Sequence, residues 1–261
     1  MRRRTVTAVL SGVVATAAAA VFAIAGTGTA NAIANGELVQ EGQYRFSVQL
    51  VMTGIPTPTG GKRNSGCSGA LIARQWIITA GHCFRDANGV RVERPVADST
   101  VATIGKADVN GTGKGYRGEI VAVRQSTTAD VSIAKLASPV RGIKPLAISD
   151  APPEAGDVLR LTGYGSTQSA SPVQETKLRT GQLEVLNVTG TTIGVEGFAP
   201  ADNTTPCPFD SGGPFFIEQR WRAPKLVSVV SDGPSCPHSE EETSARVDNL
   251  KDWIEDAIAA S

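Results

Sequence analysis

The chain has 261 residues, with 25 basic and 25 acidic side chains. Without its first 32 residues, which hold three arginines and no acids, it keeps 22 basic residues against 25 acidic ones, a net charge of −3. This mildly acidic balance argues against nucleic acid or an anionic membrane as a partner. The remaining 229 residues can bury a sizeable core, as one large all-β domain or as two small lobes.

Residues 1–32 have the features of a secretory signal peptide. Three arginines precede an apolar stretch, Ala8–Ala25, and Ala30-Asn31-Ala32 forms the small-residue cleavage pattern. The apolar stretch approaches the roughly 20 residues of a membrane span, but the cleavage site favours removal over anchoring. We therefore predict a secreted, extracellular protein that starts at Ile33 and has no membrane attachment after signal removal. The arginines leave open whether export follows the general or the twin-arginine route.

The secreted part predicts short strands separated by turns. Runs rich in β-branched residues recur between glycines and prolines, a pattern typical of an all-β sandwich or barrel. Gly54–Gly66 is expected to be an exposed loop, and Pro145–Ala155 a connection between two halves. The predicted strands are Arg45–Met52, Trp76–Thr79, Val101–Ile104, Gly118–Arg124, Val131–Leu136, Val158–Thr162, Gly181–Val188, Thr191–Val195 and Leu226–Val230.

The C-terminal segment Asn249–Ala260 differs from the rest. Its apolar residues recur at helical spacing, which predicts an amphipathic helix packed on the β core. These residues are Leu250, Trp253, Ile254, Ala257 and Ile258.

The four cysteines all lie in the secreted part, at Cys67, Cys83, Cys207 and Cys236. An even number in an exported chain predicts two disulfides, and the residues alone leave three pairings open. Zinc binding is the competing interpretation, but the spacings of 16, 124 and 29 residues match no zinc pattern. We predict no metal and no cofactor.

Two of the three segments that point to chemistry hold a histidine and an aspartate. His82 follows a strand that looks buried and lies between cysteines, in CSGALIARQWIITAGHC at Cys67–Cys83. Alone, His82 is best interpreted as an ordinary imidazole with a hydrogen-bond partner. Asp130 opens the otherwise apolar strand Asp130–Leu136, where a charge costs free energy unless it is paired. Its alternative interpretation is a solvated strand end.

The third segment is CPFDSGGP, Cys207–Pro214, in which glycines beside Ser211 allow a tight turn and close backbone approach. A serine hydroxyl is a weak nucleophile. It needs a base to take its proton, and the base needs an anion to hold its tautomer and stabilise the imidazolium. His82, Asp130 and Ser211 supply these three parts.

With these motifs together, the chain resembles the trypsin-like (chymotrypsin-fold) serine proteases, most closely small secreted bacterial members. The resemblance covers nearly all of residues 33–261. The pair DSGGP and AGHC is a specific signal, whereas GYG alone is weak. The motifs fall in family order: TAGHC at Thr79–Cys83, DVSIAKL at Asp130–Leu136, GYG at Gly163–Gly165, DSGGP at Asp210–Pro214, VVS at Val229–Ser231 and the terminal helix with Trp253.

The resemblance implies an all-β fold of two six-stranded antiparallel β-barrels with a C-terminal α-helix and an active site between the barrels. The barrels would cover about residues 33–145 and 156–246, followed by a helix at 249–260. It implies disulfides Cys67–Cys83 and Cys207–Cys236. It also implies a monomeric serine endopeptidase that acts on protein or peptide substrates through an acyl-enzyme, with proteinaceous inhibitors as candidate partners.

Carried over residue by residue, the resemblance makes His82 the general base, Asp130 its orienting group and Ser211 the nucleophile. Amides of Phe209 and Ser211 would form the oxyanion hole. Ser231 to Gly233 would pair with the substrate backbone, a form of β-augmentation.

The amino terminus Ile33-Ala34-Asn35-Gly36 fits the same family. Its members insert a new N-terminal ammonium beside the aspartate that precedes the catalytic serine, here Asp210, and a buried carboxylate needs such a charge. The predicted cleavage site ends immediately before Ile33. We therefore predict that signal peptidase creates the activating terminus and that no zymogen step is needed.

Phe209 departs from the family, which has glycine at this position. Phenylalanine keeps the N–H donor, but a positive φ would cost it roughly 1–3 kcal/mol of strain. Either the fold holds the donor in place, or the peptide flips until substrate binds and gives a slow enzyme. Pro208 narrows these options by fixing its own φ.

The sequence indicates the preferred substrate less clearly than it indicates the catalytic residues. Thr205 stands where the family places the aspartate that selects Arg or Lys. Counting back eleven residues from Trp253 puts Glu242, in the run Glu240-Glu241-Glu242, near the pocket floor, where it would attract a basic side chain. The alternatives are a solvated acidic loop and a pocket for a mid-sized apolar side chain. His238 is expected to lie on the surface.

Three functions remain open from the sequence. The leading one is a secreted serine endopeptidase. The second is a binding protein of the same fold whose cleft is disabled at Phe209, and the third is an esterase-like hydrolase with the same triad.

Overall fold

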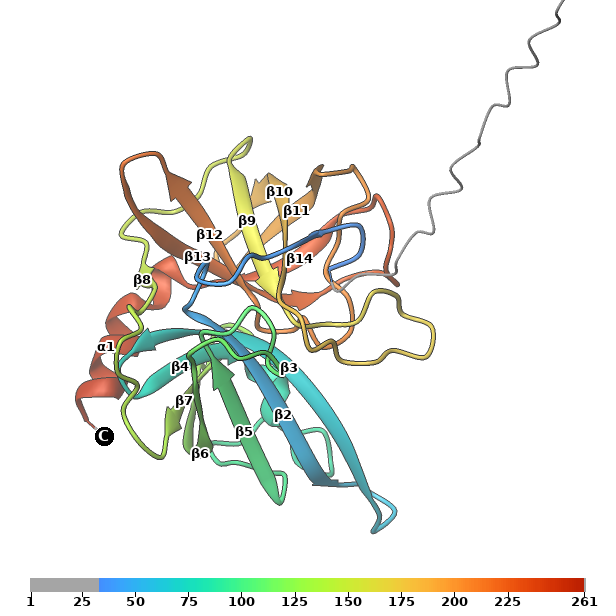
Figure 1. Cartoon of the computed structure of the whole chain (residues 1–261), viewed down its shortest axis with the longest axis vertical. Helices are drawn as coiled ribbons and strands as arrows, with labels where there is room; N and C mark the ends of the chain where they lie inside the picture. Colours follow the sequence, from blue (N-terminus) through green and yellow to red (C-terminus); the bar gives the residue numbers. More distant parts are fainter. Residues whose placement is uncertain (1–32, 261) are drawn as a thin grey trace, which may run out of the picture.

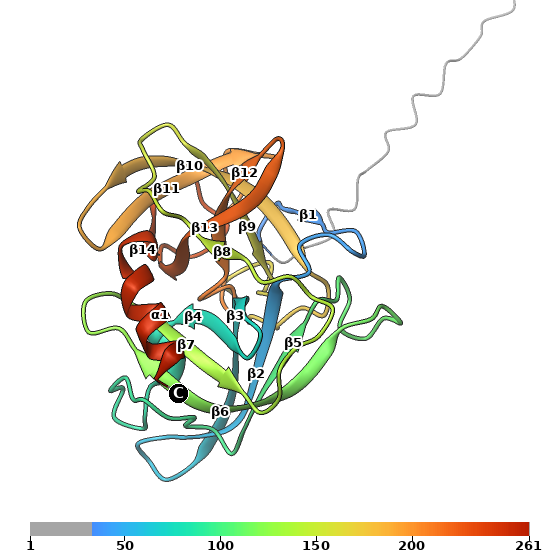
Figure 2. The same ribbon diagram turned by 90° about the vertical axis from the view of Figure 1, so that its left-hand side faces the viewer.

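The computed structural model describes residues 33–260, so the predicted signal peptide lies outside the described residues. The chain forms two β-barrels stacked on each other, with a short helix along one side (Figures 1 and 2). This architecture confirms the predicted fold class of two six-stranded antiparallel barrels and a C-terminal helix.

The N-terminal barrel closes in the order β2-β3-β4-β7-β6-β5. Its interior consists of aliphatic side chains that alternate along each strand, and β4 and most of β7 are buried on both faces. The strands are β2 (Ser47–Pro56), β3 (Lys62–Ala73), β4 (Trp76–Ala80), β5 (Ser99–Ile104), β6 (Tyr116–Gln125) and β7 (Val131–Leu136).

The C-terminal barrel closes through successive antiparallel pairs in the order β9-β10-β11-β14-β13-β12. Short strands extend it, β1 (Glu37–Leu38) along β10 and β8 (Ala147–Ile148) parallel to β13. The barrel strands are β9 (Val158–Gly163), β10 (Arg179–Val188), β11 (Thr192–Ala199), β12 (Pro214–Gln219), β13 (Arg222–Asp232) and β14 (Glu242–Arg246).

The terminal helix α1 (Lys251–Ala259) follows a 3₁₀ turn, η2 (Asp248–Leu250). Ile254 is buried, and Trp253 packs partly buried against a core cluster that contains residues of both barrels. The helix therefore packs along the seam between the barrels (Figure 2).

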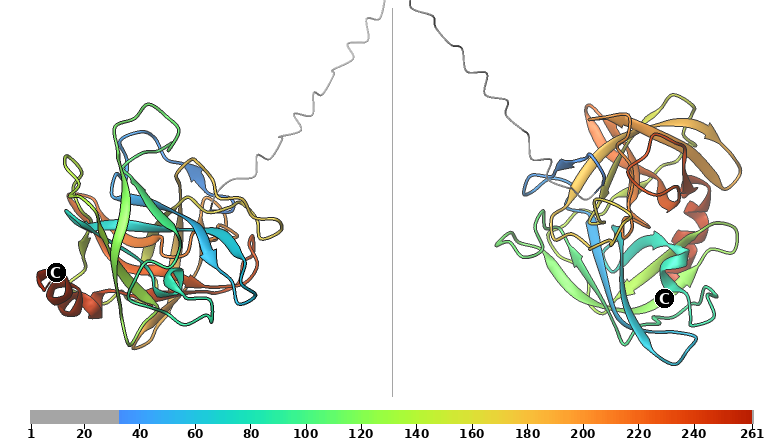
Figure 3. Two further views of the ribbon diagram at one scale, coloured as in Figure 1. Left: turned by 90° about the horizontal axis from the view of Figure 1, so that it is seen from below. Right: turned by 90° about the vertical axis from the view of Figure 1, so that its right-hand side faces the viewer.

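The segment Gly54–Gly66 is largely exposed, as predicted, but it is not a loop along its whole length. β2 continues to Pro56 and β3 starts at Lys62, so the segment forms the end of a long hairpin that projects from the N-terminal barrel (Figures 1 and 3). The start of β3 was concealed by its polar residues, which are exposed in the hairpin. Further along the strand, close packing requires a residue without a side chain. A Cβ at Gly69 would lie only 2.4 Å from the carbonyl oxygen of Ile78.

Candidate active site

His82 lies on η1 (Gly81–Phe84), a 3₁₀ turn immediately after β4. The strand before it is fully buried, and the disulfide Cys67–Cys83 ties the turn to β3. The position of the imidazole is thus set by an apolar strand on one side and a covalent link on the other. The second disulfide joins Cys207 to Cys236, so both predicted pairings are confirmed.

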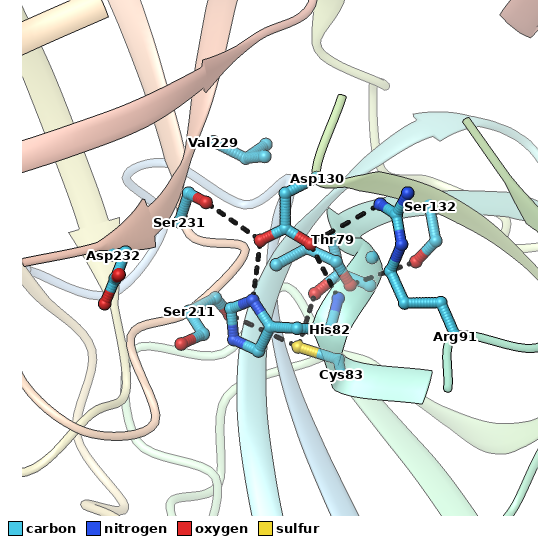
Figure 4. A network of polar contacts seen from close by, with 12 residues as sticks. Thr79, His82, Cys83, Arg91, Asp130, Ser132, Ser211, Val229, Ser231 and Asp232 are labelled. Atoms are coloured by element: carbon cyan, nitrogen blue, oxygen red, sulfur yellow. Dashed lines mark hydrogen bonds and ion pairs between the residues drawn. The ribbon is translucent and has the colours of Figure 1, made fainter. Parts of the chain in front are cut away.

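His82 contacts the carboxylate of Asp130 through two hydrogen bonds, one from its ring and one from its backbone. Nδ1 of His82 lies 2.6 Å from Oδ2 of Asp130, and the backbone N–H of His82 donates to Oδ1 at 2.8 Å (Figure 4). Asp130 precedes β7, which pairs with β4 from Ala80↔Val131 onward. The ladder therefore brings the two residues together although 48 positions separate them.

Asp130 has a further donor that the sequence did not indicate. Ser231 Oγ donates to Oδ2 at 2.8 Å from the end of β13 in the other barrel. Burial raises the pKa of Asp130, but hydrogen bonds from His82 and Ser231 outweigh burial and hold that pKa below its usual value. The carboxylate stays ionised and fixes the ring with its proton on Nδ1.

Arg91 also approaches Asp130, with Nη1 3.6 Å from Oδ1. The same guanidinium donates to the carbonyl oxygens of Ala129 at 2.7 Å and Ser126 at 3.2 Å. Arg91 therefore holds the backbone that precedes Asp130. No sequence motif had indicated this role for Arg91.

Ser211 and His82 line one cleft of about 350 Å³ between the barrels, and Figure 4 shows the serine next to the imidazole. Backbone bonds hold the serine on both sides, since its carbonyl accepts from Ser68 N–H at 2.9 Å and Gly212 N–H donates to Val230 at 2.8 Å. In the described chain no hydrogen bond joins Ser211 Oγ to His82 Nε2. Such bonds often form only with substrate bound.

Phe209 has a φ of +77°, the left-handed conformation that favours glycine. The Phe209 N–H shares its peptide group with the carbonyl of Pro208, which accepts a hydrogen bond from Ser166 N–H at 2.7 Å. On the other side, Ser68 Oγ donates to the carbonyl of Phe209 at 3.1 Å, so both peptide groups are held against a flip. Among the hydrogen bonds of the described residues, none is donated by the amide of Phe209 or of Ser211. Both donors are left for a ligand.

Asp210 is completely buried between Gly163 and Gly165, where an added Cβ would lie 2.0 Å and 2.3 Å from the carboxyl group. Amides of Cys207, Gly165 and Ile33 donate to it. Burial dominates over these donors and raises the pKa of Asp210 to about 7. Ile33 is itself fully buried beside it.

The residues predicted to determine substrate specificity do not all lie in the same cavity. Glu242, Gly233, Ser231 and Ser211 line a second cavity of about 340 Å³. Thr205 is completely buried, pairs through its backbone with Ala34 and is not among the residues that line this cavity.

The prediction that His238 lies on the surface is wrong. Its side chain is 6% exposed, and Nε2 lies 2.8 Å from Oε1 of Glu242. Proximity in sequence to the acidic run was the available signal, but polar residues at such positions are usually solvated.

The trypsin family model matches residues 33–254, and the chain belongs to this family. Two human relatives are each 28% identical over 219 residues: "Putative trypsin-6", with 76% of this chain and 83% of that protein aligned, and "Trypsin-3", with 76% and 67%. In residues 33–260, no cluster of three or more potential metal ligands occurs. No helix in the same residues is long and apolar enough to cross a membrane.

Proposed function

We propose that the chain is a secreted serine endopeptidase that hydrolyses peptide bonds through an acyl-enzyme on Ser211. The observation that supports this most directly is the His82–Asp130 pair facing the cleft that also holds Ser211. Family membership supports a serine peptidase of the same general kind.

In the proposed mechanism, His82 Nε2 takes the hydroxyl proton while Ser211 Oγ bonds to the scissile carbonyl carbon. Asp130 accepts a hydrogen bond from the Nδ1–H of the ring and stabilises the imidazolium, which keeps both of its protons. The imidazolium then protonates the leaving amine as the C–N bond breaks. The same ring then takes a proton from a water, whose oxygen bonds to the acyl carbon. The ring returns this proton to Ser211 Oγ as the acyl-enzyme bond breaks.

The amides of Phe209 and Ser211 serve as the oxyanion hole in this proposal. Removal of one such donor costs about 10²–10³ in rate, so its orientation decides whether the enzyme is fast. The hydrogen bond from Ser166 N–H to the Pro208 carbonyl supports a Phe209 donor that is already in position, at the cost of strain in a phenylalanine. The edge from Ser231 to Gly233, which continues β13, is proposed to pair with the substrate backbone.

The amino terminus is proposed to form by removal of residues 1–32, with secretion as the consequence. Cleavage converts the amide of Ile33 into an ammonium beside Asp210, whose raised pKa marks a carboxyl that lacks a compensating charge. N-terminal sequencing of the secreted protein tests this step. A start upstream of Ile33 contradicts it and requires a propeptide.

The function is tested with a fluorophosphonate probe and a peptide library, using wild type, Ser211→Ala and Phe209→Gly. We expect labelling and cleavage in wild type, and neither in Ser211→Ala. If the cleft is instead disabled at Phe209, as in a binding protein of this fold, then wild type stays unlabelled and Phe209→Gly gains labelling. Turnover of simple esters without peptide cleavage would point to an esterase.

A further inference from the structure

The cavity beside Ser211 has a carboxylate in its wall, and the contacts of that carboxylate determine what the cavity can bind. Glu242 comes from the first position of β14, and its side chain is 5% exposed. The cavity reaches from Ser211 to Glu242 and passes Val230 and Gly233. The inference below rests on the proposed function, because it concerns the substrate residue on the acyl side of the scissile bond.

One oxygen of Glu242 is already occupied. Oε1 lies 2.8 Å from Nε2 of His238, and Nδ1 of the same ring accepts the backbone N–H of Glu240 at 3.1 Å. Because Nδ1 accepts, it carries no proton, so the ring is a neutral imidazole that donates from Nε2. His238 therefore anchors the carboxylate without neutralising its charge.

The other oxygen faces the cavity wall. A Cβ built on Gly233 would lie 1.8 Å from Oε2 of Glu242, so the absence of a side chain at 233 is what lets this oxygen reach the surface of the cavity. Gly233 and Glu242 both line the cavity. The pocket thus offers one free carboxylate oxygen.

No positive charge balances this site. No lysine or arginine lines the cavity in the described chain, and Asp232 adds a second acid to its wall. Burial, then the charges of Asp232 and Asp210, raise the pKa of Glu242 to about 8. Glu241 is directed elsewhere, since its Oε1 accepts from Asn187. A cation that entered the cavity would offset the cost of ionising Glu242.

We propose that His238 is a specificity-positioning residue: it holds Oε1 of Glu242 so that Oε2 alone receives the substrate, and the pocket selects lysine over arginine. A guanidinium forms its strongest carboxylate contact through two parallel bonds and needs both oxygens. An ammonium is a compact charge that binds one carboxylate oxygen and completes its bonds with other acceptors. Ser169 and Ser235 line the same cavity.

The test compares three peptide substrates that differ only before the scissile bond, with Lys, Arg or the uncharged Met. We expect kcat/KM for Lys to exceed that for Arg, and that for Met by at least about tenfold, the value of a charge-assisted bond. The Lys-to-Met ratio should rise between pH 6 and pH 9 as Glu242 loses its proton. Equal rates for all three, or a preference for Arg, overturn the proposal.

Variants separate positioning from general stability. Glu242→Gln should abolish the Lys-to-Met ratio, whereas His238→Ala frees Oε1 and should move the Lys-to-Arg ratio towards arginine. His238→Gln retains an amide donor and should keep the wild-type ratio. An unchanged Lys-to-Arg ratio in His238→Ala contradicts the role of His238, and the wild-type pH series remains decisive if this variant does not fold.

Probe labelling of Ser211 distinguishes failure of this inference from failure of the proposed function. Labelling without lysine preference overturns the inference alone. If no labelling occurs, the proposed function fails, and binding of n-butylammonium and n-butylguanidinium to Ser211→Ala by calorimetry still tests the pocket. Tighter binding of the ammonium supports the selectivity of the pocket; equal or weaker binding overturns it.

Discussion

Asp210 is completely buried, whereas the side chain of Asp130 is 24% exposed, and the two carboxylates also differ in the donors around them. Asp130 receives the ring and amide of His82 and the hydroxyl of Ser231, and its pKa is lowered. Asp210 receives only amides and has a pKa raised to about 7. The carboxylate of Asp130 is therefore already ionised, whereas the carboxyl group of Asp210 needs a nearby cation to become ionised at neutral pH.

The largest expected effect tests the Asp130 side of this comparison. Asp130→Asn keeps the size of the side chain but removes the charge and disturbs the tautomer of His82, so kcat should fall by about 10⁴. Peptide hydrolysis at pH 7–8 measures it, with circular dichroism as the control for folding. A fall of less than tenfold would contradict the role of Asp130.

The second prediction concerns the Asp210 side and its dependence on pH. With an uncut terminus, the folded state keeps a proton on Asp210 up to about pH 7, whereas the unfolded carboxyl loses it near pH 4. The contribution of Asp210 to the free energy of unfolding therefore falls as the pH rises from 4 to 7. At pH 8 this loss is on the order of 4 kcal/mol. An ammonium on Ile33 removes this loss.

A chain that starts at Ile33 should thus have a higher Tm at pH 8 than one extended by Asn31-Ala32, and the difference should shrink at pH 5. Thermal unfolding of both chains at the two pH values measures it. Asp210→Asn is the matched control, since without the carboxylate a chain that starts at Ile33 should lose its higher Tm at pH 8. The same Tm difference at both pH values would show that Asp210 does not sense the terminus.

A smaller effect is expected where one donor to Asp130 is removed. Ser231→Ala loses a hydrogen bond to a charged group, worth about 1.5 kcal/mol, and kcat/KM should fall about tenfold. Ser231→Thr keeps the hydroxyl and should restore most of the activity. Equal losses in both variants would indicate that the backbone at 231, not the hydroxyl, is what matters.

The smallest effect is expected at Arg91. Its side chain is 29% exposed and its contact with Asp130 is 3.6 Å long, so solvent weakens the pair. Arg91→Gln should lower kcat/KM by less than about fivefold, the range of a partly exposed ion pair. The difference in kcat/KM from wild type should shrink in high salt, because salt screens the charge of Arg91. If salt leaves the difference unchanged, the loss comes from the contacts of Arg91 with the two carbonyl groups instead.

The two barrels also differ in how much of them was predictable. In the N-terminal barrel, β-branched runs located four of the six strands and overlapped a fifth. The signal is strongest in β4 and β7, which are apolar because they are almost entirely buried on both faces. The strands β12 and β14 of the other barrel were missed. β14 reads Glu-Thr-Ser-Ala-Arg, and its Ser244 is buried against Ser228 and the carbonyl of Val229, so hydrogen bonds replace apolar packing there.

The sequence alone predicted the class of fold, and through the family resemblance it predicted the two disulfides. It also predicted the candidate residues His82, Asp130 and Ser211. These predictions were possible because the motifs depend on residue types at short spacings. Only the tertiary structure placed Ser231 and Arg91 on Asp130 and paired His238 with Glu242. The contacts with Asp130 join residues far apart in the chain, and His238 and Glu242, although four positions apart, do not lie on a helix. Their burial and their proton positions depend on how the barrels fold and pack, which a linear pattern of residues does not record.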